Sequence, residues 1–173
     1  HATTAAELVA TSLSTASLIT LGGNATGTAS NIAAMGTNGD NIALNSKILT
    51  VTEYTTNDIS DITGSGTVNV STVDGASLVD AKLTTADAIT ISTGTTTIDA
   101  ATADEVAFMA KTTVAENATL TLNNYVNTDL SGLTNAGAFK VNTTTSAVLD
   151  SAKLADATLV TLGATTTATA ASA

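Results

Sequence analysis

The stretch Ala76-Ser-Leu-Val-Asp-Ala-Lys-Leu-Thr-Thr-Ala-Asp-Ala-Ile-Thr-Ile91 decides the fold of this chain, because variants of it occur three times. One further copy is Ala147–Leu162, and an earlier copy is Glu7–Leu21. Repetition at a fixed spacing is typical of solenoids and arrays, whose usual work is to scaffold, adhere or assemble. The copies therefore predict a stacked architecture before any single element is assigned.

The repeat extends well beyond this unit. Ile48–Ile91 aligns without a gap with Thr119–Leu162, and 16 of the 44 aligned pairs are identical. We call this the long repeat; its period is about 71 residues. Lys82 and Lys153 fall on the same position of it. The sequence thus predicts one repetitive domain over residues 1–173, either a slice of a longer array or a subunit that stacks on itself.

The composition favours a thin β-rich core. The chain has no Cys, Pro, Trp, Arg or Gln, and only four aromatic residues. Compact globules usually fill a deep core with large aromatic side chains, so their scarcity points to a narrow core of Val, Ile, Leu and Ala. Abundant Thr and Val favours strands. We therefore expect a mainly β protein.

The spacing of the strand signals predicts the size of one coil. Stretches that alternate apolar residues with Thr are centred near positions 20, 50, 69, 90, 98, 121, 140 and 160, mostly about 20 residues apart. This spacing is typical of one solenoid coil. The pattern thus predicts a right-handed β-solenoid-like stack of coils of about 20 residues, with the long repeat covering about three of them.

Short helical segments interrupt this pattern. Leu78, Ala81 and Leu83 fit a single helical or 3₁₀ turn with one buried side. Thr102–Thr112 is the best helix candidate, and Ser30–Met35 fits a shorter equivalent, so one or two short helices are expected. The Thr/Ala tail, residues 165–173, is expected to be unanchored.

Charge and residue content exclude several functional classes. The net charge is −10, with 15 acidic residues against five lysines, so the chain lacks the basic patch of a nucleic-acid binder. No apolar run approaches the length of about 18 residues that a spanning helix needs, so no membrane insertion is expected. One histidine and no cysteine exclude structural zinc sites and Cys/His nucleophiles. We assign no catalytic residue and expect no enzymatic activity.

Two acidic turns are candidate calcium sites. Asp40 with Asn41, and Asp58 with Asp61, each cluster oxygen ligands in a predicted turn. The alternative is that both are plain solvated turns. Asp58 recurs in the second copy of the long repeat, but Asp61 is replaced there by Gly132, so a calcium site would not repeat.

The acidic, Cys-free, Thr/Ala/Val-rich texture and units such as Leu78–Ile91 resemble bacterial surface-layer proteins and large secreted adhesins of the calcium-repeat type. This resemblance implies an exported, extracellular cell-surface protein that assembles into a lattice or filament, often with calcium.

We therefore expect a non-enzymatic structural protein of an extracellular surface layer or filament. It would form homo-oligomers through the ends or edges of its solenoid, and Leu8–Leu21 and Leu149–Leu162 are the expected contact segments because they are similar and uncapped. The alternative is an adhesin segment that binds a surface or host ligand.

Overall fold

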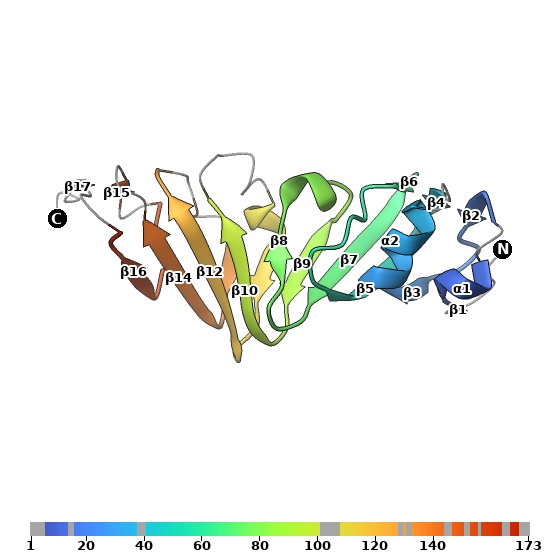
Figure 1. The fold of residues 1–173 in the computed structure, drawn as a ribbon, viewed down its shortest axis with the longest axis horizontal. Coiled ribbons are helices and arrows are strands. Elements are labelled where there is room, and N and C mark those ends of the chain that lie inside the picture. Colours follow the sequence, from blue (N-terminus) through green and yellow to red (C-terminus); the bar gives the residue numbers. More distant parts are fainter. Residues whose placement is uncertain are drawn as a thin grey trace.

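The fold is described from a computed structural model of the chain. The structure describes residues 6–13, 16–37, 41–100, 108–127, 130, 133–143, 147–150, 153–155, 157–163 and 167–169. In Figure 1 the colours run in sequence order along the long axis, so the two chain termini lie at opposite ends of an elongated molecule.

Within the described residues the strands form four sheets, and every pairing in them is parallel. The largest sheet contains, in order, β1 (Ala6–Glu7), β3 (Ala25–Thr28), β5 (Lys47–Tyr54), β7 (Gly66–Thr72), β9 (Ala88–Ile91), β11 (Thr112–Val114) and β13 (Thr134–Asn135). A second contains β8 (Ser77–Leu78), β10 (Gly94–Asp99), β12 (Ala118–Tyr125), β14 (Ala138–Thr143) and β16 (Leu159–Thr161). The smaller sheets contain β2 (Leu18–Thr20), β4 (Asn41–Ala43) and β6 (Ile62–Thr63), and β15 (Val148–Asp150) and β17 (Thr167–Thr169).

Within each sheet a strand pairs with the strand two places along the chain, so the backbone returns to the same sheet after one circuit. Val70 thus lies beside Ile89, and Ala25 lies beside Leu49. The predicted mainly β class is confirmed. The eight predicted strand centres all fall in strands.

The core lies between the sheets and consists mostly of aliphatic side chains. Strand β7 alternates exposed or half-buried positions with fully buried Val68 and Val70. Strand β14 repeats this pattern with Phe139 and Val141. Each such side chain contributes about 1.5–3 kcal/mol when removed from water, so a narrow core suffices if every circuit adds to it.

Two short α-helices occur in the described residues, α1 (Ala10–Leu13) and α2 (Ala29–Thr37), together with the 3₁₀ turns η1 (Asp80–Lys82) and η3 (Met109–Lys111). The predicted turn after Leu78 is therefore present, although Ala81 is exposed and not buried. Helix α2 extends the predicted Ser30–Met35 segment at both ends.

Two sequence expectations need correction. Most of the predicted helix Thr102–Thr112 lies outside the described residues, but its last residue begins strand β11. The tail was expected to be unanchored, whereas β17 pairs with β15 in register. Thr favours strands, but the low-complexity sequence of the tail does not show that it has a partner, because that partner, β15, lies elsewhere in the chain.

The long repeat also spans a different number of circuits than expected. The alignment of Ile48 with Thr119 places β5 on β12, and the seven steps between these strands correspond to three and a half circuits. Because seven is odd, the repeat carries a strand of the seven-stranded sheet onto one of the five-stranded sheet. The equivalent strands even share a bulge, at Glu53 (φ 56°) and Asn124 (φ 57°).

Candidate functional site

The two predicted calcium turns lie in different settings. Asp40 is outside the described residues, and Asn41 is exposed at the start of β4. Asp58 and Asp61 are both exposed in the turn between β5 and β6. Asp58 accepts hydrogen bonds from the Ser60 hydroxyl at 2.7 Å and the Ser60 N–H at 3.0 Å.

These hydrogen bonds determine the electrostatics of the turn. The Ser60 hydroxyl and N–H hold the pKa of the Asp58 carboxyl below its usual value, and the positive charge of Lys82 acts in the same direction. Asp58 is therefore an anion over the whole physiological range of pH. Its charge is already partly satisfied within the turn.

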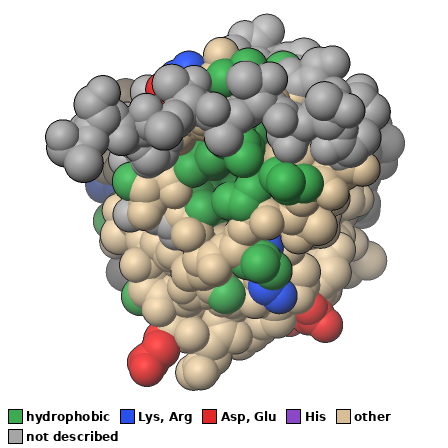
Figure 2. Space-filling model, turned by 90° about the vertical axis from the view of Figure 1, so that its left-hand side faces the viewer, with side chains coloured by type: hydrophobic (Ala, Val, Ile, Leu, Met, Phe, Trp, Pro, Cys, Tyr) green, Lys and Arg blue, Asp and Glu red, His purple; other side chains and the backbone are tan. Residues whose placement is uncertain are grey.

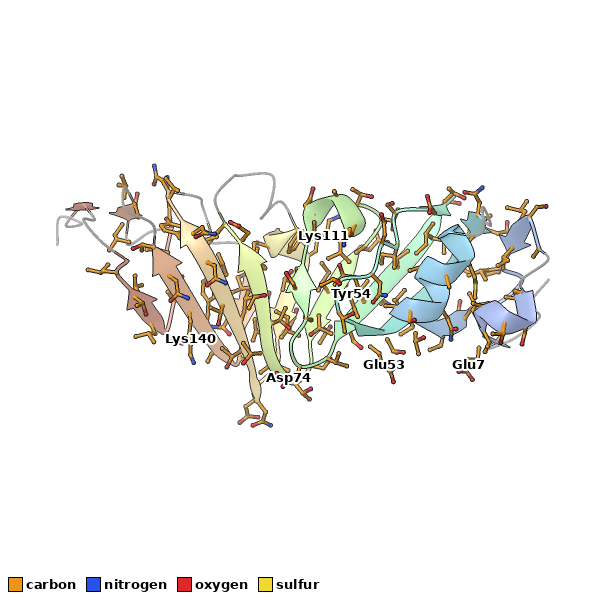
Figure 3. All side chains as sticks on the ribbon, in the orientation of Figure 1. Glu7, Glu53, Tyr54, Asp74, Lys111 and Lys140 are labelled. Carbon is orange, nitrogen blue, oxygen red and sulfur yellow. The ribbon has the colours of Figure 1, made fainter. Side chains whose placement is uncertain are left out.

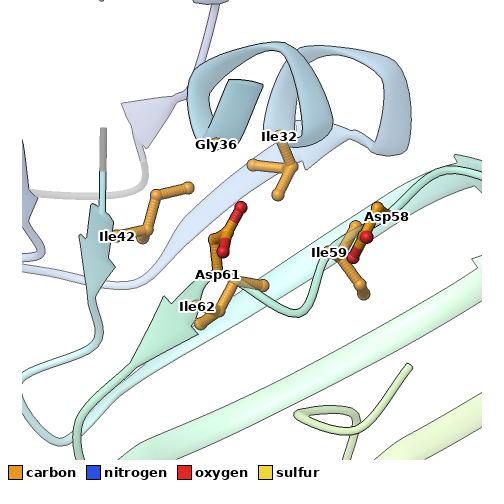
Figure 4. Close-up of a pocket in the computed structure, with 7 residues that line it drawn as sticks. All are labelled: Ile32, Gly36, Ile42, Asp58, Ile59, Asp61 and Ile62. Carbon is orange, nitrogen blue, oxygen red and sulfur yellow. The ribbon is translucent and has the colours of Figure 1, made fainter. Parts of the chain in front are cut away.

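A small pocket brings Asp58 and Asp61 to the same part of the surface (Figure 4). Asp61 points towards Gly36 on α2, where an added Cβ would lie 2.5 Å from Asp61 Oδ2, whereas Asp58 lies beside Ile59. Within the described ranges no three carboxylate or imidazole side chains converge. The turn thus offers two carboxylates among aliphatic neighbours. The other lining residues are Ile32, Gly36, Ile42, Ile59 and Ile62.

The repeated lysines connect successive circuits to each other. Lys82 Nζ donates to the carbonyl oxygen of Thr56 at 2.8 Å, and its counterpart Lys153 donates to the carbonyl oxygen of Asn127 at 3.2 Å. The equivalence of Lys82 and Lys153 is visible in the sequence, but their acceptors are not, because any residue can supply a backbone carbonyl.

Tyr54 is a buried polar residue in the first copy of the long repeat, Ile48–Ile91. Its side chain is fully buried, and the hydroxyl has no hydrogen-bond partner among the residues that the structure describes. Burial and the nearby charge of Asp58 raise the pKa of the Tyr54 phenol above its ordinary value. Figure 3 shows Tyr54 in the middle of the stack, away from both ends. The residue therefore remains a neutral phenol.

The two ends of the row of paired strands carry open strand edges. Strands β1 and β2 are the outermost strands at the N-terminal end, and β16 is the outermost strand of the five-stranded sheet at the other end. A hollow of about 330 Å³ opens at the N-terminal end. It is lined by Ala6, Glu7, Leu8, Val9, Ser12, Leu13, Ala16, Leu18, Ile19 and Thr20.

The C-terminal end carries an exposed apolar area, visible in Figure 2 between described polar atoms and residues drawn in grey. Leu159 is 52% exposed and Leu162 is 56% exposed. The predicted contact segments Leu8–Leu21 and Leu149–Leu162 thus lie at opposite ends of the molecule. Sequence reasoning missed the hollow, because it lies between α1 and β2 and the placement of two elements leaves no local pattern.

Comparison with known proteins adds no relative. No protein-family model, no curated protein and no solved structure matches the chain. Among the helices of the described residues, none is both long and apolar enough to cross a membrane.

Proposed function

We propose that this protein is a non-enzymatic structural protein of an extracellular surface layer or filament, built as a right-handed β-solenoid. The parallel pairing of every second strand supports the solenoid, and parallel crossovers are right-handed in about 98% of known cases. The open strand edges at both ends carry the proposal of self-assembly.

The physical basis is the unpaired backbone of an edge strand. An exposed edge presents N–H and C=O groups that another strand can pair with, and natural proteins usually blunt such edges with charge, proline or a covering loop. Strands β2 and β16 contain no charged residue and no proline. Their composition therefore favours pairing with another chain.

Calcium is the proposed ion of this assembly, held by Asp40, Asn41, Asp58 and Asp61. Calcium takes about six to eight oxygen ligands, so two exposed carboxylates would need further oxygens from the neighbouring turn, from water or from an adjacent copy. The exposure of Asn41, Asp58 and Asp61 leaves them accessible for that role.

Negative-stain microscopy of the purified chain, with calcium and with a chelator, tests this proposal. Ordered fibres or sheets are the expected result, and their loss in the chelator would assign the ion a part in assembly. Dispersed monomers at all protein concentrations in both conditions would contradict self-assembly.

The alternative is an adhesin segment, and one observation favours it. Hydroxyl side chains on the outward face of the large sheet are aligned as successive partners across four strands. They are Ser71, Thr90, Thr113 and Thr134. A surface row of hydroxyl groups can form hydrogen bonds with a hydrated ligand such as a polysaccharide. Binding of monomers to an immobilised polysaccharide, without assembly, would favour this function over the first.

A further inference from the structure

The three copies of the repeat unit show what each end of the stack lacks. In the middle copy, β9 pairs with β7 on one side and with β11 on the other. In the first copy β2 pairs with β4, the repeat counterpart of β11, and in the last copy β16 pairs with β14, the counterpart of β7. Each end copy thus has only one of the two strand neighbours that β9 has. Among the described residues, β2 lacks the neighbour on the N-terminal side, and β16 lacks the neighbour on the C-terminal side.

One side chain shows this loss most clearly. Leu21, Ile91 and Leu162 occupy the same position in the three copies, directly at the end of the repeated strand. Leu21 and Ile91 are completely buried, whereas Leu162 is 56% exposed. In the middle copy Ile91 lies beside Val114 of the next circuit, and Leu162 has no described counterpart of this contact. Leu162 is therefore exposed at a position where the other two copies bury the side chain.

The N-terminal end lacks cover on the opposite side. Leu13 and Ala16 are only partly buried there, although their middle-copy counterparts Leu83 and Ala86 are each 1% exposed. Both residues line the hollow of about 330 Å³, which is large enough to receive an aliphatic side chain. This end is thus concave where the other end projects a leucine.

We propose that two copies of this chain stack head to tail, with Leu162 of one copy seated in the N-terminal hollow of the next. This inference rests on the proposed function and specifies its interface. The unpaired edge of β16 faces the C-terminal end of the molecule, and that of β2 faces the N-terminal end. These two edges therefore meet only in a head-to-tail arrangement. A two-fold dimer would instead join two identical ends, which is the closed alternative.

Charge is compatible with the same polarity. Glu7 is exposed on the outermost N-terminal strand, and it is the single charged residue among described residues 6–37. Residues 138–163 carry Lys140, Asp150, Lys153 and Asp156, whose charges cancel, and Lys140 is the direct partner of Leu159. Figure 3 shows Glu7 and Lys140 in opposite halves of the molecule. A head-to-tail contact therefore places Glu7 against a segment without net charge, whereas joining two N-terminal ends would bring two Glu7 side chains together.

A head-to-tail contact is heterologous, so it leaves an open N-terminal hollow on one outer copy and an open Leu162 on the other. Addition can then continue without limit in one dimension. The expected product is a polar filament rather than a dimer of fixed size.

Three single variants test the interface. L162D places a carboxylate at the C-terminal contact, and L18D places one at the rim of the hollow. I48D is the matched control, since Ile48 is 41% exposed on β5, away from both ends. All three positions are exposed, and circular dichroism and the Tm check that each variant folds. Sedimentation velocity measures the size of each species.

We expect I48D to assemble like the natural chain, and L162D and L18D each to remain monomeric when alone. Burying an unpaired carboxylate in an apolar hollow should weaken self-association by about 100-fold or more. When the two variants are mixed, L18D still offers its Leu162 and L162D still offers its hollow. The mixture should therefore form one-to-one heterodimers and stop there.

Other outcomes separate this inference from the proposed function. Assembly of L162D and L18D at the level of the natural chain would overturn the end contact while leaving self-assembly in place. Dimers of L18D alone, with monomeric L162D, would show a two-fold contact between C-terminal ends and overturn the polarity. Loss of assembly in I48D would point to a lateral contact and overturn the end-to-end stack. A natural chain that never assembles would overturn the proposed function itself.

Discussion

At the residue scale, equivalent positions in the two copies of the long repeat adopt the same unusual backbone with different side chains. The bulge in β5 places Glu53 in the left-handed region, and the bulge in β12 places Asn124 there. Asn tolerates this conformation better than Glu, because its short polar side chain bonds locally to the backbone. The fold thus retains the bulge even where the residue is unfavourable, which indicates that the surrounding pairing enforces it.

The turn at Asp58 makes a testable prediction about pH. The pKa of Asp58 is lower in the folded chain than the value of about 3.9 expected when unfolded, so its contribution to stability is present above that pH and is lost as the pH falls through the folded pKa. Ser60→Ala removes the hydroxyl donor. We expect its Tm to lie about 1–3 °C below that of the natural chain at pH 7, with the difference shrinking towards about pH 2.5.

The control for this experiment is Asp58→Asn, which cannot titrate. In that background Ser60→Ala should shift the Tm by the same amount at both pH values. A Tm difference that grows as the pH falls would contradict the assignment of the hydrogen bond to the ionised carboxylate.

At the element scale, neighbouring circuits are joined by side chains that bond to backbone groups. Asp87 Oδ2 accepts from the N–H of Val68 at 2.8 Å, and its counterpart Thr158 Oγ1 accepts from the N–H of Phe139 at 3.0 Å. The same bond is thus made by a carboxylate in one copy and a hydroxyl in the next. The position shared by Asp87 and Thr158 therefore requires a short side chain with a hydrogen-bond acceptor, and it does not require a charge.

This equivalence predicts the effect of two substitutions. Asp87→Ala leaves the N–H of Val68 without its acceptor and should lower the free energy of unfolding by about 1 kcal/mol. Asp87→Thr copies the second copy of the repeat and should stay within about 0.5 kcal/mol of the natural chain. Urea unfolding followed by circular dichroism measures both values.

Glu116→Ala controls for the loss of one negative charge, because Glu116 is exposed and the chain carries a net charge of −10. If Asp87→Thr were as destabilising as Asp87→Ala, relative to this control, the two repeat positions would not be equivalent in energy.

At the scale of the whole molecule, each circuit contacts mainly the circuits before and after it. The most extensive contacts are between β5 and β7, between β10 and β12 and between β12 and β14, all of which lie away from the two ends. Stability in such a chain is approximately a sum of unit and nearest-neighbour terms. The end circuits have one neighbour each and should open first.

Hydrogen exchange tests this gradient. We expect amides of β7 and β12 to exchange about 100-fold more slowly than those of β2 and β16 in the monomer, because opening an end strand breaks only one interface. Under assembling conditions β2 and β16 should slow selectively. Uniform exchange rates along the monomer would contradict a nearest-neighbour stack.

The sequence predicts the long strands of this protein well, but it does not predict the shortest strands or the contacts between elements. The alternation of apolar residues with Thr located eight of the strands, including all the longest ones, since strand periodicity is a local property. Two-residue strands such as β6 and β8 escaped, because two residues cannot show a period and such strands exist only through their partners. The spacing of the candidate turn residues identified Asp58 and Asp61, but not that Asp61 faces Gly36 on α2.

The sequence by itself determined that the chain is repetitive and mainly β, because periodicity and composition act locally. Tertiary structure alone decided that the long repeat covers three and a half circuits, since only strand pairing shows which sheet each copy joins. It also decided that Leu162 is exposed while Leu21 and Ile91 are buried. These three residues occupy equivalent sequence positions, but their exposure differs because burial depends on whether another strand lies over the side chain.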